Sequence, residues 1–238
     1  MKLKSKIWFA ALVAVLVLIS SCKKDRDIVI PPPLTPWIIY GSLTDLDGNI
    51  YKTIPIGSQT WMVQNLKTTR YNDGTSIPLV TDGTFWSNLS TPAYCWQKND
   101  PAYRVTYGLL YNWYAVNTGK LCPSGWHVAS EAEWTRMTDY LGGENIAGGK
   151  LKETGFRHWD SPNTGATNES YFRAFPGGNR INGPDALFSN LREMGYWWTT
   201  SSGEDWAANR LMYYDSNHVQ KSICPKSWGL SVRCVRDY

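Results

Sequence analysis

The sequence predicts an α+β domain in which two helical segments precede a small antiparallel sheet with long irregular loops. The helical patterns lie within residues 107–141, where apolar residues recur at intervals of three and four. The strand patterns lie toward the C-terminus, where short alternating segments are separated by Gly, Pro and Asn turns. Helices followed by strands, without regular alternation of the two, are typical of the α+β class.

The two predicted helices are residues 108–117 and residues 130–141. Gly119 lies just beyond the first segment and provides a stop signal. In the second, Ser130 and Glu133 have the spacing of a capping box, in which each side chain bonds the backbone N–H of the other residue. The segment between the helices, LCPSGWHV, is expected to be extended. The apolar residues that define the first helix are Leu109, Leu110, Trp113 and Val116.

Residues 42–56 predict a β-hairpin, because alternating segments flank an Asp-Gly-Asn turn. A further short strand is expected within residues 59–66. Asp45, Asp47 and Asn49 also have the spacing of the first half of a calcium-binding loop, and they are the candidate metal ligands of the chain. The glutamate that closes such a loop is missing, so the pattern is incomplete.

The rest of the chain is divided between loops and short strands. Residues 67–100 and 142–167 are rich in turn-forming residues and are expected to be irregular, with a short amphipathic piece at 149–154. His158 is interpreted as a loop residue, and no cluster of potential ligands has zinc spacing. The predicted C-terminal strands are residues 172–175, 195–201, 207–214 and 229–235.

The N-terminus has the pattern of an export signal. Three lysines precede an apolar run over residues 7–19, which is too short to span a bilayer but fits a secretory signal peptide. The run ends in Ser20-Ser21-Cys22, which resembles a bacterial lipobox. Residues 1–22 are therefore predicted to be a lipoprotein signal peptide with Cys22 as the lipidated residue. The alternative is an ordinary signal peptide followed by an unrelated cysteine.

A tether and one globular domain are expected to follow. Residues 23–36 begin with charged side chains and continue into three consecutive prolines, a composition that favours an extended, semi-rigid spacer. Residues 37–238 are long enough for one well-buried core and are predicted to form a single domain. The chain is therefore expected to be exported and held by its lipid at the outer membrane or the cell surface.

Charge and aromatic content narrow the classes of function. The formal charge is +4, but removing the three leader lysines from the 24 basic residues leaves 21 against 20 acidic ones. A nearly neutral domain argues against nucleic acid as a partner. The 13 Trp and 14 Tyr against 6 Phe suit half-buried surfaces and flat ligands such as sugars. The competing interpretation is that Trp fills the core of a loop-rich domain.

Four cysteines remain once Cys22 is assigned to the lipid, and an oxidising compartment favours disulfides between them. They can pair in three ways, and no CxxC redox or zinc spacing occurs. These cysteines are Cys95, Cys122, Cys224 and Cys234.

Several ordered blocks between residues 44 and 237 resemble the Fibrobacter succinogenes major paralogous domain family. That resemblance places the chain among lipoproteins and secreted proteins, notably of Bacteroidetes-type bacteria. The family is itself similar to the formylglycine-generating, sulfatase-modifying group and to the wider C-type lectin-like fold. The blocks are TDLDGNIYKTIPIGSQTWMVQNLK, YCWQKND, YGLLYNWYAV, LCPSGWHVASEAEW, FPGGNR, GYWWTTSS and GLSVRCVRD.

The resemblance implies a fold and a disulfide pattern. A lectin-like fold has two helices and a twisted antiparallel sheet closed by the N- and C-terminal strands. By the lectin-like pattern, the cysteine before the second helix pairs with the one in the last strand, which implies Cys122–Cys234 and leaves Cys95–Cys224 as the second pair. The competing local pattern is Cys95–Cys122 with Cys224–Cys234.

The resemblance implies little enzymatic activity. The oxidising enzymes of the related group use two nearby cysteines to bind copper, and here Cys224 stands without a second thiolate for that soft ion. The calcium triplets of sugar-binding lectins are also missing. No spacing identifies a glycosidase pair of carboxylates or a serine-hydrolase motif. No cofactor is therefore predicted, and calcium enters only through the incomplete loop at Asp45.

The function predicted from the sequence is a membrane-anchored, non-enzymatic binding or adhesion module for a glycan or an envelope protein. The lipobox, the proline spacer and the lectin-like scaffold motivate it. One alternative is a structural envelope protein without a small ligand, and another is an enzyme related to the formylglycine-generating group. The candidate ligand-binding residues are Asn179, Arg180, Trp197, Trp198 and Trp206.

Overall fold

The computed structural model describes residues 39–183 and 187–237. The predicted signal peptide (1–22), with its lipidation candidate Cys22, and the predicted tether (23–36) lie outside these residues. The chain divides into two units, and the second, which begins at Ile39, is described by itself. Within the described residues, no helix is long and apolar enough to cross a membrane.

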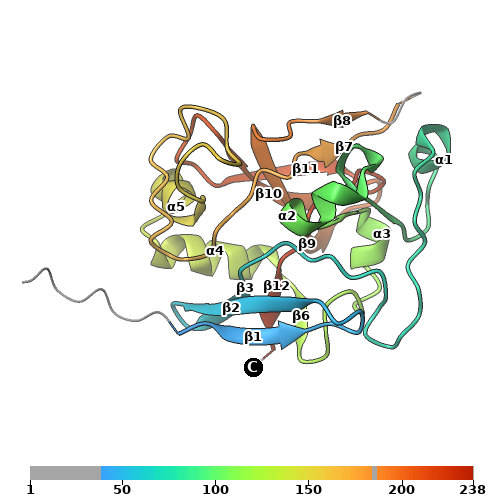
Figure 1. The fold of residues 1–238 in the computed structure, drawn as a ribbon, viewed down its shortest axis with the longest axis horizontal. Helices are drawn as coiled ribbons and strands as arrows, with labels where there is room; N and C mark the ends of the chain where they lie inside the picture. Colours follow the sequence, from blue (N-terminus) through green and yellow to red (C-terminus); the bar gives the residue numbers. More distant parts are fainter. Residues whose placement is uncertain (1–38, 184–186, 238) are drawn as a thin grey trace, which may run out of the picture. The chain divides into compact units, whose positions relative to one another are not determined.

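The larger sheet has five antiparallel strands in the order β1-β2-β3-β12-β6 (Figure 1). The last strand, β12, lies between β3 and β6, so strands from both ends of the described chain share one sheet. This strand pairing ties the N-terminal hairpin to the C-terminus. The strands are β1 (Gly41–Thr44), β2 (Ile50–Ile56), β3 (Gln59–Met62), β6 (Trp126–Val128) and β12 (Cys234–Arg236).

The predicted N-terminal hairpin is confirmed. β1 and β2 pair antiparallel, with Thr44 opposite Ile50 at the end nearest the turn. Gly48 in this turn has a φ of 77°, a conformation that a residue with a Cβ adopts only at a cost. Alternation along β2 then buries Tyr51 completely while Ile50 stays exposed.

The second sheet has three antiparallel strands in the order β11-β10-β9. Two of them were expected from the sequence, and β11 was missed because its segment does not alternate clearly. Two further two-stranded sheets pair β4 with β5 and β7 with β8. These strands are β9 (Met194–Ser202), β10 (Trp206–Tyr213), β11 (Gln220–Pro225), β4 (Tyr94–Cys95), β5 (Leu110–Tyr111), β7 (Asn179–Arg180) and β8 (Phe188–Ser189).

The longest helix of the described chain, α4 (Glu131–Tyr140), begins where the sequence predicts. Ser130 Oγ accepts from Glu133 N at 3.3 Å, and Glu133 Oε2 accepts from Ser130 N at 2.8 Å, so the capping box is confirmed. The shorter helical segments are α1 (Gly83–Ser87), η1 (Gln97–Asn99), η2 (Pro101–Tyr103), α2 (Arg104–Tyr107), α3 (Trp113–Val116) and α5 (Glu144–Leu151).

The predicted helix at residues 108–117 is wrong. Gly108 has a φ of 77° and ends α2, and the chain then forms β5, because Leu110 pairs with Cys95. Asn112 caps a new short helix, α3, through its side-chain oxygen. The four apolar residues that suggested a helix are all buried, but Leu110 belongs to β5, Trp113 and Val116 belong to α3, and Leu109 lies outside both.

Three other segments also differ from expectation. The short amphipathic piece predicted at 149–154 is the end of the longer helix α5, in which Gly148 and Gly149 allow the backbone at Asn217 and Gly165 to approach closely. Residues 172–175 form no strand, and only Ala174 makes an isolated bridge. In the predicted strand at 229–235, Gly229, Leu230 and Ser231 make isolated bridges, and β12 begins only at Cys234.

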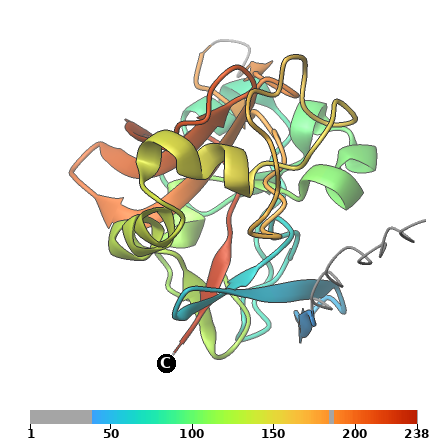
Figure 2. The ribbon, with the colours of Figure 1, turned by 90° about the vertical axis from the view of Figure 1, so that its left-hand side faces the viewer.

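Buried tryptophans join the two larger sheets. Trp134 of α4 lies 5.2 Å from Trp61 of β3 and 5.9 Å from Trp197 of β9, measured between ring centroids. Phe172 packs edge-on against Trp61 and Trp134. Helix α4 therefore lies between the sheets, as the two views in Figures 1 and 2 agree.

The architecture combines a few short helices with several small antiparallel sheets, which agrees with the predicted α+β class. The sequence predicted one small sheet, whereas the described strands form four separate sheets. The C-type lectin-like assignment stays a prediction.

Candidate functional site

An open groove of about 280 Å³ lies where three parts of the chain meet. These parts are the first residue of β2 with the segment after β3, helix α2, and the loop between α5 and β7. Figure 2 shows α2 in green and this loop in yellow to orange on the same side of the domain. We call this site the cationic groove. It is lined by Lys67, Arg157, His158 and Arg173 together with the uncharged Ile50, Gln64, Val105, Thr106 and Phe175.

One carboxylate, on Glu153, supports the wall of the cationic groove from behind. Its Oε1 accepts from Nε and Nη2 of Arg173 at 3.1 and 2.8 Å, and its Oε2 accepts from Nδ1 of His158 at 2.5 Å. The Glu153 side chain is 12% exposed, so both bonds are shielded from solvent on the carboxylate side. Charge-assisted bonds of this kind fix the orientation of the donors. Glu153 therefore positions two groove-lining side chains at once.

Aromatic rings form the second support of this wall. The rings of His158 and Phe175 lie 4.6 Å apart, and Tyr107 of α2 packs edge-on against His158 at 5.9 Å. The Arg173 guanidinium lies 5.0 Å from the centroid of Phe175, within the range of a cation–π contact. Helix α2 and the loop are thus held together through packed rings.

The other cations at the cationic groove lack acidic partners among the described residues. Lys67 and the exposed Arg157 form no ion pair there. Arg104, behind Lys67, donates only to the neutral oxygens of Asn49 Oδ1 and Lys67 O, both at 3.2 Å. Burial, and then the neighbouring Arg104, lower the pKa of Lys67, against a smaller opposing effect of Asp45. Positive charge therefore exceeds negative charge at this site.

Asn179 and Arg180, predicted to contact a ligand, are enclosed in the interior at 1% exposure each. The Arg180 guanidinium donates to the backbone carbonyls of residues 80–82 and lies 4.4 Å from the Trp86 ring. Asn179 Oδ1 accepts from Nδ2 of Asn190 at 3.1 Å. Both side chains brace loops, so the prediction that they face a ligand is wrong.

The three predicted tryptophans divide between core and surface. Trp197 and Trp198 are fully buried, and their indole N–H groups donate to Asn65 Oδ1 at 2.9 Å and to the Tyr111 carbonyl at 2.7 Å. Their assignment as ligand contacts is therefore wrong. Trp206 is 42% exposed, so it remains accessible, but it begins β10 and does not line the cationic groove.

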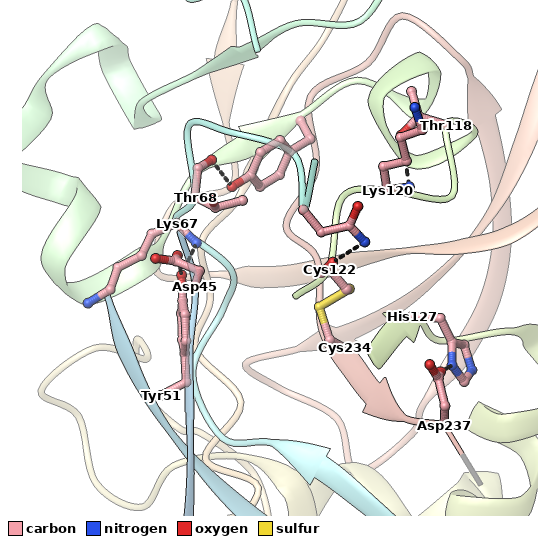
Figure 3. Close-up of a disulfide and its surroundings, with 12 residues drawn as sticks. Asp45, Tyr51, Lys67, Thr68, Thr118, Lys120, Cys122, His127, Cys234 and Asp237 are labelled. Carbon is pink, nitrogen blue, oxygen red and sulfur yellow. Dashed lines mark hydrogen bonds and ion pairs between the residues drawn. A yellow bond between two sulfur atoms is a disulfide. The ribbon is translucent and has the colours of Figure 1, made fainter. Parts of the chain in front are cut away.

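The candidate metal ligands hold the hairpin turn through bonds within the protein. Asp45 accepts from the N–H groups of Asp47 and Asn49 and from the Asn49 side chain. It also accepts from the Tyr51 hydroxyl at 2.7 Å, a bond drawn in Figure 3. The Asp47 carboxylate turns toward residues 68–70 and bonds Arg70 Nε at 2.7 Å. The described residues include no group of three or more His, Cys, Asp or Glu arranged for a metal ion. The turn is therefore closed by hydrogen bonds.

One of the two predicted disulfides is present in the structure. Cys122 and Cys234 form a disulfide that links the segment before β6 to β12 (Figure 3). Cys95 and Cys224 are buried free thiols, so the predicted Cys95–Cys224 bridge is wrong. They belong to different sheets and to different hydrophobic clusters, which explains why they do not meet. Burial raises the pKa of Cys95 to about 12 and also raises that of Cys224.

Most residues of the cationic groove carry no local sequence signal. Lys67 and Arg173 are more than one hundred positions apart, and each stands in a segment that reads as loop or strand. His158 was interpreted as a loop residue, which is correct, but its contact with Glu153 depends on the fold. The nearest sequence clue is the Phe175 block, which the family resemblance includes.

Comparison with protein families returned one match. The model described as the Fibrobacter succinogenes major domain covers residues 54–236, which include all of the groove-lining residues except Ile50. The resemblance inferred from the sequence blocks is thereby confirmed. No curated protein matches the chain, and no solved structure matches it.

Proposed function

The chain belongs to the Fibrobacter succinogenes major domain family, and we propose that it is a non-enzymatic, glycan-binding module of the cell envelope. In this proposal a lipid on Cys22 anchors the domain, and the cationic groove binds the glycan. The observation that carries it is the groove itself, where accessible charged, hydrogen-bonding and apolar side chains converge on a supported wall. Such convergence is typical of small-ligand sites.

The chemistry of the cationic groove supports binding in preference to catalysis. Glycoside hydrolysis uses two carboxylates on either side of the bond, and covalent catalysis uses a nucleophile beside a base. The lining side chains of the described groove include no carboxylate, and Glu153 is already shared by Arg173 and His158. The groove therefore offers positioned donors and apolar contacts.

The lipid anchor rests on the N-terminal sequence pattern, and it is tested separately from binding. Cells expressing the full-length chain are grown with an alkyne analogue of palmitate, and the purified protein is examined for label. We expect label on the wild-type chain and none on Cys22→Ser, because the proposed attachment atom is the Cys22 sulfur. Equal labelling of the two proteins would remove the anchor from the proposal.

Glycan binding at the cationic groove is tested with the full-length chain in mild detergent on a glycan array. Val105 is 80% exposed in α2, so Val105→Trp fills the groove without disturbing the core. Ile223→Trp is the matched control, because Ile223 is 59% exposed and lies in β11, outside the groove. We expect glycan binding by the wild type and the control and its loss in Val105→Trp. Unchanged binding by Val105→Trp would contradict the proposed site.

A further inference from the structure

Three cations meet at the cationic groove, and in the described part of the chain no acidic side chain forms an ion pair with them. Lys67 and Arg157 line it, Arg104 lies directly behind Lys67, and none of the three has an ion pair among the residues described. Like charges held close together repel one another unless an anion or solvent compensates them. The direction of the Lys67 pKa shift, downward through burial and Arg104, agrees with such a site. An anionic ligand would relieve this repulsion.

Arg173 is oriented in advance for an anion. Its Nε and Nη2 bond Glu153, its guanidinium lies over Phe175, and its side chain stays 47% exposed. The remaining donor, Nη1, makes no hydrogen bond within the described part of the chain. A guanidinium held in this way loses little conformational freedom when it binds a carboxylate or sulfate.

Uncharged neighbours of the cations suit a polyhydroxylated ligand. Gln64 Oε1 accepts from Lys52 N at 2.8 Å, so the side-chain oxygen of Gln64 is occupied and its amide N–H groups point away from Lys52. Thr106 contributes a hydroxyl to the lining of the groove. Ile50 and Val105 are exposed by 69% and 80% and offer branched aliphatic surface for the C–H face of a sugar ring. A volume of about 280 Å³ lies near the lower end for small-ligand pockets and fits one ring of an open chain.

On the premise that the proposed glycan site is correct, we infer that the cationic groove selects acidic saccharides. A carboxylate or sulfate on one sugar lies between Lys67, Arg157 and Arg173, and the same ring packs against Ile50 and Val105. Affinity is expected to fall as salt rises, because the cations are partly exposed.

Matched saccharide pairs test this selectivity with the full-length chain in mild detergent. The probes are uronate oligomers and their methyl esters, sialylated and desialylated glycans, and sulfated and desulfated glycans. Arg157→Gln removes one groove cation that has no partner to lose. Arg136→Gln is its control, because Arg136 is exposed on α4, outside the groove. Polyglutamate is included as an acidic competitor that has no sugar.

We expect the acidic member of at least one pair to bind about tenfold more tightly than its neutral partner, by analogy with charge-assisted bonds elsewhere. Arg157→Gln should lower that affinity about fivefold to tenfold, and Arg136→Gln should leave it unchanged. If the neutral and acidic members bind equally well and Val105→Trp abolishes the binding of both, the acidic selectivity is overturned. The proposed glycan site is then still supported. Binding of no pair would overturn both proposals. Equal competition by polyglutamate would overturn the saccharide assignment.

Discussion

Glu153 Oε1 accepts two hydrogen bonds from the Arg173 guanidinium, at 3.1 and 2.8 Å, while the second oxygen of the same carboxylate holds His158. Glu153 directly follows Lys152, and its backbone N–H donates to Ala174 O at 3.2 Å. The two ends of the loop between α5 and β7 are therefore fastened side by side. These contacts of Glu153 fix the position of the wall of the cationic groove.

Replacing Glu153 with Gln should destabilise the protein by about 1–3 kcal/mol, because the amide keeps only one acceptor oxygen for the side chains of Arg173 and His158. Chemical unfolding of the full-length chain measures the change. Glu169→Gln is the control: it also breaks an ion pair, with Lys150, but Glu169 is exposed and such pairs contribute little. An equal effect of the two substitutions would contradict the supporting role of Glu153.

His127 should make stability depend on pH. Its imidazole bonds Glu133 and Asp237, and the second bond is drawn in Figure 3. The pKa of His127 rises to about 9, and the hydrogen bond with Glu133 is the largest cause. Partial burial lowers this pKa, and the bond with Asp237 raises it further. The unfolded imidazole has a pKa of about 6.5. The folded state therefore binds the proton more tightly.

The contribution of His127 is complete below about pH 6.5 and is lost as the pH rises through about 9. We expect the free energy of unfolding of the wild-type chain to decline across this interval. His127→Gln should flatten the decline, and Asp237→Asn, which removes one of the two partners, should flatten it less. A decline that persists unchanged in His127→Gln would show that another group causes it.

Arg233 should be among the most costly side chains to remove. It is 1% exposed, and its guanidinium donates to Asn65 Oδ1 and to the backbone carbonyls of residues 62, 63, 172 and 173. Arg233→Met leaves several buried acceptors unsatisfied and should cost at least about 3 kcal/mol. Arg236→Met, at an exposed position nearby in β12, should change stability little. A small effect of Arg233→Met in chemical unfolding would contradict this bracing role.

The four cysteines that the structure describes should behave as one linked pair and two free thiols. Alkylation of the denatured chain without reductant should modify Cys95 and Cys224, while a digest of the same sample retains a Cys122–Cys234 peptide. This bridge spans 112 residues, so the Cys122→Ser/Cys234→Ser variant should lose about 4–5 kcal/mol in the chain-entropy model. Detection of a Cys95–Cys224 peptide by mass spectrometry would contradict the assignment.

Calcium should have no effect on the hairpin turn. The oxygens of Asp45 already accept four hydrogen bonds within the turn and from Tyr51. The thermal midpoint should therefore be the same with millimolar calcium and with chelator, whereas a cation bound only by the folded state would raise it. Asp45→Asn should lower the midpoint, because the amide nitrogen cannot accept from the Tyr51 hydroxyl. A rise with calcium would restore the turn as a metal site.

Local signals in the sequence predicted local structure well. The Ser130–Glu133 capping box and the hairpin turn at Gly48 depend on neighbouring residues only, and both are found where expected. The helix at 108–117 failed because the same apolar spacing also fits a strand when Leu110 finds Cys95 as its partner. That pairing joins segments whose proximity no local pattern encodes.

The candidate site was harder to predict than the fold. Trp197 and Trp206 look alike in the sequence, and only packing against Trp134 makes the first a core residue. The cationic groove combines Lys67, Arg157 and Arg173 from distant segments, so its charge appears only in three dimensions. A nearly neutral total charge concealed it.

The most direct test of the central claim, that the cationic groove is the ligand site, is a methyl-resolved NMR titration of the full-length chain in detergent with an acidic oligosaccharide selected on the array. The Ile50 and Val105 methyl groups line the groove, and those of Ile223 lie outside it. Saturable shifts at Ile50 and Val105, with Ile223 unchanged, are the predicted result. Shifts at Ile223 that leave Ile50 and Val105 unmoved would contradict the claim and place the site elsewhere.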